Sequence, residues 1–253
     1  MNFVADSGRG PAILFLHGVP SPAAGLAPLG RPLLARHRVL VPELPGYGKS
    51  SPVAGIYDFG RVNELVLSDL AARGIRELAG VVGFSGGAYR ALLLALDGRL
   101  PIGRLALLAG TAGPAEDERP LFAQFAAMVG AGPIGPELSN LCRERMLSPG
   151  FRQAQPDRAA EIDGWLHASA REVLAAELAA FAQAPDLLPR LGALDTPILA
   201  RVGEADVSCP PSKSQAIARA ARHATVQVVP GAGHALEIED ATGTAAALDG
   251  FFG

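Results

Sequence analysis

The chain has 253 residues, a net charge of −3 and 49% hydrophobic residues. A chain of this length can bury a large core, and α/β proteins of this size commonly form one domain. The slight negative charge and the lack of Lys/Arg runs interleaved with aromatic residues argue against nucleic acid as a partner. Charged or turn residues interrupt every apolar run before the ~18–20 residues that span a membrane, so no membrane association is predicted.

The first residues show no basic stretch followed by an apolar one, so we expect no secretory signal and a cytoplasmic protein. Cys142 and Cys209 lack metal or disulfide spacing and are expected to be reduced thiols without a catalytic role. A phosphate-binding loop at Gly48-Lys49-Ser50 is excluded because Glu43 stands where that motif needs glycine. The dinucleotide fingerprint also fails for want of its third glycine, and no cofactor or metal is expected.

Strand-like and helix-like segments alternate along most of the chain. The strands are expected at 12–16, 38–42, 78–83, 103–109, 196–202 and 224–229, and the helices near 23–36, 61–73, 86–97, 210–221 and 234–252. This alternation predicts an α/β fold with a mostly parallel sheet covered by helices on both faces. Met1 to Pro11 suffice for one short strand at most before the first parallel strand.

The regular alternation breaks in a Gly/Pro-punctuated, helix-rich segment. We therefore predict a core of residues 1–112 and 191–253 with a helical cap inserted at 113–190. A first cap helix carries apolar residues at helical spacing, and a second runs from about 157 to 184 with room for one break; the apolar residues of the first are Leu121, Phe122, Phe125, Met128 and Val129. Each alone is more simply explained by packing, but together they predict an apolar roof over a pocket.

The segment Gly83-Phe84-Ser85-Gly86-Gly87 carries the clearest chemical signal. It joins an apolar run, Leu78 to Val82, to a predicted helix, Ala88 to Leu96. A sharp strand-to-helix turn needs glycine on both sides, because a Cβ there collides with the neighbouring chain, and it pushes the serine outward. The pattern predicts a nucleophile elbow, with a Gly-rich turn and a capping serine as the alternative.

A serine nucleophile needs a histidine to take its proton and a carboxylate to orient that histidine. His234 lies in a loop after the strand-like run 224–229, and Asp206 follows the run 196–202 directly. Taken singly, Asp206 is equally compatible with a helix N-cap and His234 with an ordinary loop histidine. The order Ser85, Asp206, His234 is that expected of a triad on loops at the carboxyl ends of parallel strands.

At this point the chain resembles the α/β-hydrolase family over nearly its whole length. The resemblance rests on the elbow, the triad loops and two further blocks, which are Leu14-Phe15-Leu16-His17-Gly18-Val19-Pro20 and Glu43-Leu44-Pro45-Gly46-Tyr47-Gly48-Lys49-Ser50. The second block begins with Glu43 where the family usually has Asp, which we expect to be tolerated. The usual N-terminal hairpin is expected to be trimmed. The resemblance implies an oxyanion hole from the backbone amides of Val19 and Gly86, and for His17 we favour a structural role.

The expected function is that of a serine hydrolase acting through an acyl-enzyme on a small to medium, fairly hydrophobic ester or lactone. Carbon–carbon bond hydrolysis and other triad chemistry (thioesterase, perhydrolase, hydroxynitrile lyase) remain open, because substrate choice depends on the cap and loops. A cationic group close to Ser85 would favour an acidic carbon–carbon substrate. Arg143, Arg145 and His167 are expected at the surface or against the core. A non-catalytic ligand-binding homologue is the alternative from another class, and the oligomeric state is left open.

Overall fold

In the computed structural model, which describes residues 1–52 and 57–253, a seven-stranded sheet forms the centre of the molecule. Its order is β1-β3-β2-β4-β5-β6-β7, and only the pair β1 and β3 is antiparallel. The strands are β1 Phe3–Ser7, β2 Ala12–Leu16, β3 Arg38–Pro42, β4 Gly80–Phe84, β5 Leu105–Leu108, β6 Ile198–Gly203 and β7 Ala224–Val229. The mostly parallel α/β sheet is confirmed, with β1 as the one short strand before β2.

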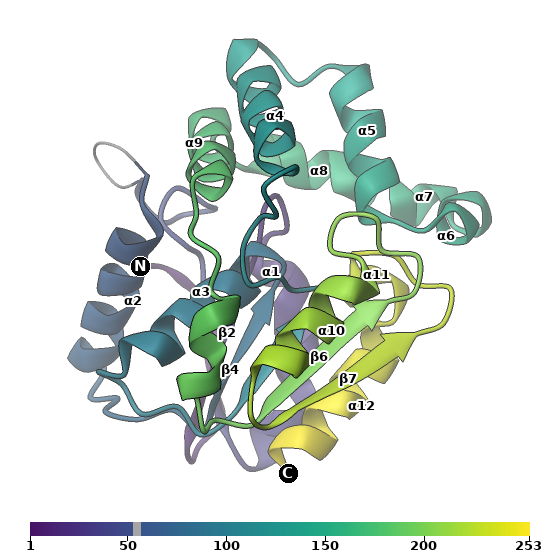
Figure 1. Cartoon of the computed structure of the whole chain (residues 1–253). Helices are drawn as coiled ribbons and strands as arrows, with labels where there is room; N and C mark the ends of the chain where they lie inside the picture. Colours follow the sequence, from purple (N-terminus) through teal and green to yellow (C-terminus); the bar gives the residue numbers. More distant parts are fainter. Residues whose placement is uncertain (53–56) are drawn as a thin grey trace.

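Both faces of the sheet are buried under helices (Figure 1). Side chains alternate along a strand, so Leu14 and Leu16 of β2 join one core cluster, while Ile13 and Phe15 join the other. The first face is covered by α2 Phe59–Ala72, α3 Gly86–Asp97, α10 Pro211–Ala220 and the 3₁₀ helix η2 Leu188–Ala193; the second is covered by α1 Ala23–Leu26, the 3₁₀ helix η1 Ala27–Ala35 and α12 Ala241–Phe252.

A group of helices between β5 and β6 lies beyond one end of the sheet (Figure 1). They are α4 Arg119–Ala131, α5 Pro136–Met146, α6 Pro149–Ala154, α7 Pro156–Ala159, α8 Glu161–Ala168 and α9 Arg171–Ala182. Helices α4 and α9 pack against each other. Because β4 and β5 are parallel and both end here, the insertion lies over the carboxyl ends of the central strands.

Three predicted helices differ from the structure for local reasons. The segment 23–36 is mostly 3₁₀ helix, because Pro28 and Pro32 lack the N–H groups that an α-helix needs. The segment 234–252 is divided into α11 Leu236–Glu239 and α12 at Asp240, whose carboxylate accepts from Arg201 at 2.5 Å. The region 157–184 holds α7, α8 and α9 in place of one helix with one break, and α5 and α6 were not individually predicted.

Within the described part of the chain, every helix is too short or too polar to cross a membrane.

Candidate active site

Ser85 stands at a strained corner between β4 and α3. Its backbone has φ 53° and ψ −118°, a region that side-chain-bearing residues rarely adopt. The corner closes because of two glycines. A Cβ on Gly87 would lie 2.0 Å from the Leu16 carbonyl oxygen, and one on Gly83 would lie 2.4 Å from the Gly87 carbonyl oxygen. Gly86 is freer, with no atom within 3.4 Å of such a Cβ among the described residues.

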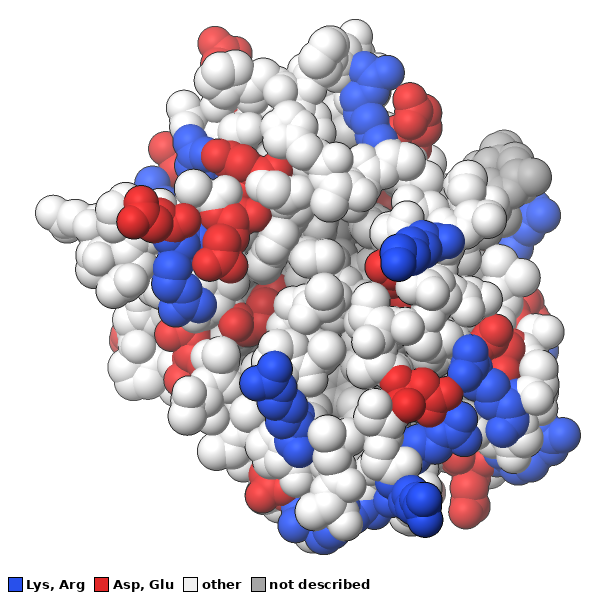
Figure 2. Space-filling model, turned by 180° about the vertical axis from the view of Figure 1, so that it is seen from behind, with Lys and Arg blue, Asp and Glu red and all other residues white. Residues whose placement is uncertain are grey.

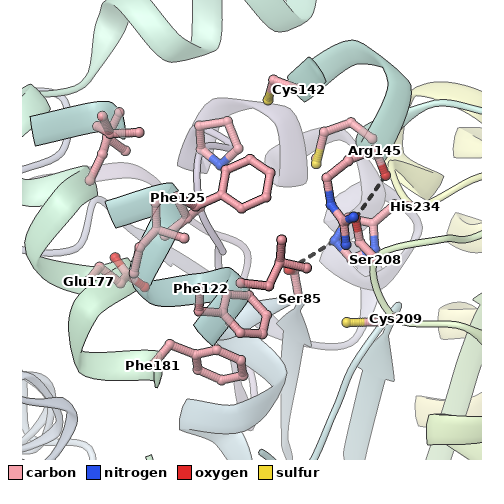
Figure 3. A pocket seen from close by; sticks show the side chains of 18 of the residues that line it. Ser85, Phe122, Phe125, Cys142, Arg145, Glu177, Phe181, Ser208, Cys209 and His234 are labelled. Atoms are coloured by element: carbon pink, nitrogen blue, oxygen red, sulfur yellow. Dashed lines mark hydrogen bonds between the residues drawn. The ribbon is translucent and has the colours of Figure 1, made fainter. Parts of the chain in front are cut away.

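The three predicted triad residues form a continuous series, in which His234 lies within hydrogen-bond distance of both Ser85 and Asp206. His234 Nε2 is 2.9 Å from Ser85 Oγ (Figure 3), and His234 Nδ1 is 2.8 Å from Asp206 Oδ2. They come from the ends of β4, β6 and β7, which the sheet order brings to one edge. His234 and Asp206 are buried, while Ser85 is partly exposed toward a pocket.

Asp206 is fixed by the turn that follows it. Its second oxygen, Oδ1, accepts the backbone N–H groups of Ser208 and Cys209, each at 2.8 Å. Helix α10 begins later, with Pro210 at its N-cap and no side-chain cap bond, so Asp206 is not the cap of that helix. Asp206 is thus held as an acceptor that faces His234.

Val19 and Gly86 line the same pocket as Ser85 and His234. The segments that contain Val19 and Gly86 lie side by side. A Cβ on Gly18 would be 2.8 Å from Ser85 Cβ and 3.0 Å from the Gly86 nitrogen. The close approach explains why residue 18 is glycine. His17 belongs to the framework of this corner: its Nε2 accepts the Leu44 N–H at 3.0 Å, and burial lowers the pKa of His17 to about 4.

The pocket above Ser85 is mainly apolar and is shared by core and insertion (Figure 3). Four of the five apolar residues singled out in the first insertion helix line it, whereas Met128 is 40% exposed outside it. The apolar and aromatic side chains around the pocket are Val19, Pro20, Phe59, Leu121, Phe122, Phe125, Val129, Leu138, Met146, Leu166, Leu174, Leu178 and Phe181. Cys142 and Cys209 also line it as free thiols, and burial raises the pKa of both, that of Cys142 to about 12.

Arg145 also lines the pocket, although the sequence indicated only a surface or packing role. Its Nη2 donates to the Val207 carbonyl at 3.3 Å, and its own carbonyl accepts from Ser208 Oγ at 2.9 Å. These bonds connect α5 to the Asp206 turn and hold a cation at the pocket. Arg143 instead pairs with Asp163 inside the insertion, and His167 is exposed.

A second charged group in the pocket is Glu177, which was not predicted from the sequence. Its Oε1 pairs with Arg90 Nη2 at 2.5 Å, and its Oε2 accepts from Tyr47 Oη at 2.6 Å. Burial works against the charge of Arg90, but Glu177, together with Tyr57 and Tyr47, outweighs this effect and raises the pKa of Arg90 above its ordinary value. Burial, and then Glu177, raises the pKa of Tyr47 as well. The sequence contains a signal for this pair, because each is a charged residue on an apolar helix face. Glu177 lies on the same buried face of α9 as Val173, Leu174 and Phe181, and Arg90 interrupts the apolar residues of α3.

A further carboxylate, Glu237, lies three residues after His234. Its Oε1 accepts from Ser21 Oγ at 2.9 Å, and its Oε2 is buried with no partner among the described residues. Burial raises the pKa of Glu237 to about 7.

Residues 13–247 match the model of the alpha/beta hydrolase family. The chain belongs to the α/β-hydrolase family. The structure of this α/β hydrolase is also similar to solved structures of other proteins. It superposes on an esterase from Thermogutta terrifontis with a TM-score of 0.89 (24% identity, covering 97% of this chain and 90% of that one). It superposes on an enol-lactonase from Burkholderia xenovorans LB400 with a TM-score of 0.85 (23% identity, 99% and 95%).

Among curated proteins, this α/β hydrolase is 35% identical over 115 residues to a 2-hydroxy-6-oxononadienedioate/2-hydroxy-6-oxononatrienedioate hydrolase of Cupriavidus pinatubonensis. That match spans 43% of this chain and 40% of the relative. The matched region is thus less than half the length of the relative, and the structural neighbours share less than a quarter of their residues. The comparisons therefore show the family and fold, and relatives of more than one hydrolytic activity.

Proposed function

We propose that this α/β hydrolase is a serine hydrolase that cleaves a small to medium, fairly hydrophobic ester or lactone. The observation that carries the proposal is the hydrogen-bonded series Ser85–His234–Asp206 at the floor of a mainly apolar pocket. A helical insertion covers that pocket, which fits a cap that keeps bulk water from the reacting groups. We assign this cap to residues 113–190.

His234 takes the Ser85 proton as Ser85 Oγ attacks the substrate carbonyl, and Asp206 stabilises the resulting imidazolium. The carbonyl oxygen becomes an oxyanion, for which the backbone amides of Val19 and Gly86 are the proposed donors. Collapse of this intermediate expels the alcohol, which receives the proton from His234 and leaves an ester on Ser85. Water then attacks that ester with the same proton transfers, releasing the acid and restoring Ser85.

The direct test is the substitution Ser85→Ala. We expect it to lower hydrolysis of 4-nitrophenyl butyrate by at least about 10³-fold, since no other group supplies the nucleophile. Ser68→Ala, at an exposed position on α2, is the matched control and should retain wild-type activity. Circular dichroism should show both variants folded. Activity of folded Ser85→Ala within tenfold of wild type would overturn the proposal.

Carbon–carbon bond hydrolysis is the second candidate. It is supported by the names of the two curated relatives, both hydrolases of dioate substrates, and by Arg145, a cation in the pocket that suits a carboxylate. Turnover of 2-hydroxy-6-oxononadienedioate by the wild type, lost in Arg145→Gln, would favour this candidate over the ester hydrolase.

A small-molecule substrate remains the proposed partner. The face in Figure 2 carries Lys and Arg interspersed with Asp and Glu and shows no broad block of one sign, which supports the prediction that nucleic acid is not a partner. A cytoplasmic location is likewise kept as a proposal.

A further inference from the structure

The Glu177–Arg90 ion pair lies at the end of the pocket nearest Gly86. Glu177 comes from α9 in the insertion, and Arg90 comes from α3, the helix that begins after Ser85. Their side chains are 2% and 0% exposed. Removing two charges from water is costly, and a packed apolar pair would often serve stability as well. The pair therefore calls for an explanation beyond stability.

Glu177 stands between Arg90 and the pocket. The carboxylate of Glu177 lines the pocket, and a Cβ on Gly86 would lie 3.5 Å from its Oε1. Arg90 is not among the lining residues. Its guanidinium carbon lies 4.4 Å from the ring centroid of Phe59, a side chain that does line the pocket. The cation is thus one side chain away from the substrate space.

Arg90 has more donors than Glu177 uses. Its Nη2 serves both Glu177 and the Tyr57 hydroxyl, while Nε and Nη1 are buried without a partner in residues 1–52 and 57–253. A guanidinium is suited to bind a carboxylate through two parallel hydrogen bonds. In this protein the carboxylate beside it comes from the chain itself.

We infer that Glu177 is a specificity-determining residue that occupies the position of a substrate carboxylate on Arg90 and so makes the pocket select uncharged over anionic substrates. The inference rests on the proposed function for the identity of the site. A substrate carboxylate that enters this end of the pocket is repelled by the negative charge of Glu177. It also loses its hydration without gaining Arg90 as a partner, because Arg90 is already paired with Glu177. Arg145 is bonded to the Asp206 turn and lies on a different side of the pocket from Glu177 (Figure 3).

The test compares mono-4-nitrophenyl adipate, which carries a free carboxylate, with its neutral methyl ester, 4-nitrophenyl methyl adipate. Glu177→Gln keeps the size of the side chain and removes its charge, which leaves Arg90 available as a cation. We expect this variant to raise the ratio of kcat/KM for the anionic over the neutral ester at least tenfold relative to wild type. Glu172→Gln, an exposed carboxylate on the same helix, should leave the ratio unchanged.

Two double variants identify the cation that is responsible. Adding Arg90→Met to Glu177→Gln should return the ratio to within threefold of wild type, whereas adding Arg145→Gln should preserve the gain. The inference is overturned if Arg145→Gln abolishes the increase in this ratio while Arg90→Met preserves it. It is also overturned if folded Glu177→Gln shows no increase in the ratio. The proposed function survives both results, because it stands or falls on the loss of neutral ester hydrolysis in Ser85→Ala.

Binding provides a readout that is independent of turnover. Isothermal titration calorimetry measures the affinity for hexanoate and for hexanamide. The ratio of the hexanoate affinity to the hexanamide affinity should be at least tenfold higher in Glu177→Gln than in wild type. If Glu177→Gln does not fold because Arg90 is left unpaired, refolding with millimolar hexanoate should recover the native circular dichroism spectrum and hexanamide should not. Equal effects of the two molecules would contradict the inference.

Discussion

At the residue scale, the site depends on a few side chains held in unusual environments. Ser85 is strained, His234 lies between an alcohol and a carboxylate, and Glu237 is a buried acid three residues after His234. Because these environments differ, the carboxylates have different tasks. Asp206 accepts two backbone N–H groups in addition to its contact with His234. Among the described residues Glu237 accepts only from Ser21, and burial raises its pKa.

Glu237 predicts a defined pH dependence of stability. Its pKa rises from 4.5 in the unfolded chain to about 7 in the folded one, so the folded state holds the proton more tightly. Stability from this group is therefore complete below about pH 4.5 and is lost as pH rises through 7, by about 3 kcal/mol as an order of magnitude. Glu237→Gln should remove this dependence.

The measurement is urea unfolding of wild type and Glu237→Gln at several pH values between 4.5 and 7.5. The free energy of unfolding of the variant minus that of wild type should increase with pH across this window. Effects of His17, whose pKa is lowered, cancel because both proteins contain it. Glu161→Gln, at an exposed position, should follow wild type. Parallel curves for Glu237→Gln and wild type would contradict the burial argument.

At the element scale, the elbow is a contact between β2, β4 and the start of α3. Gly87→Ala places a Cβ 2.0 Å from the Leu16 carbonyl, where the backbone cannot yield as a flexible side chain does. We expect a loss of about 1–3 kcal/mol in the free energy of unfolding, together with lower esterase activity as Ser85 moves. Gly164→Ala in α8 has no atom within 4 Å among the described residues and should instead stabilise the chain by about 0.5–1 kcal/mol.

Thermal unfolding and 4-nitrophenyl butyrate hydrolysis of both glycine variants check this account. If Gly87→Ala keeps wild-type stability and activity, the inference that close packing at the elbow excludes a Cβ at position 87 is contradicted.

Elements with a strong local signal were predictable from the sequence. The apolar runs of β2 and β4 and the glycines around Ser85 mark the elbow directly. The division at Asp240 was not predicted, and Asp240 is paired with Arg201, 39 residues away in the chain. Glu177 and Arg90 are 87 residues apart, so their pairing requires the packing of α9 over α3. Sequence patterns therefore located the proposed nucleophile, whereas the charged end of the pocket became visible only in the tertiary structure.

At the scale of the whole molecule, the site exists only when the chain is folded. Ser85 and His234 are 149 residues apart and meet because β4 and β7 end at the same edge of one sheet. The insertion then completes the pocket, with Phe181 of α9 stacked edge-on against Phe59 and Tyr89 of the core. Any reactivity of Ser85 that depends on His234 should disappear when the chain unfolds.

Labelling with a fluorophosphonate tests this central claim most directly, because the reagent modifies an activated serine and also separates an enzyme from a ligand-binding homologue. We predict one adduct per folded chain, located at Ser85 by peptide mass spectrometry, and none in Ser85→Ala or in urea-denatured protein. Absence of labelling in the folded wild type, or labelling at another residue, would contradict the account.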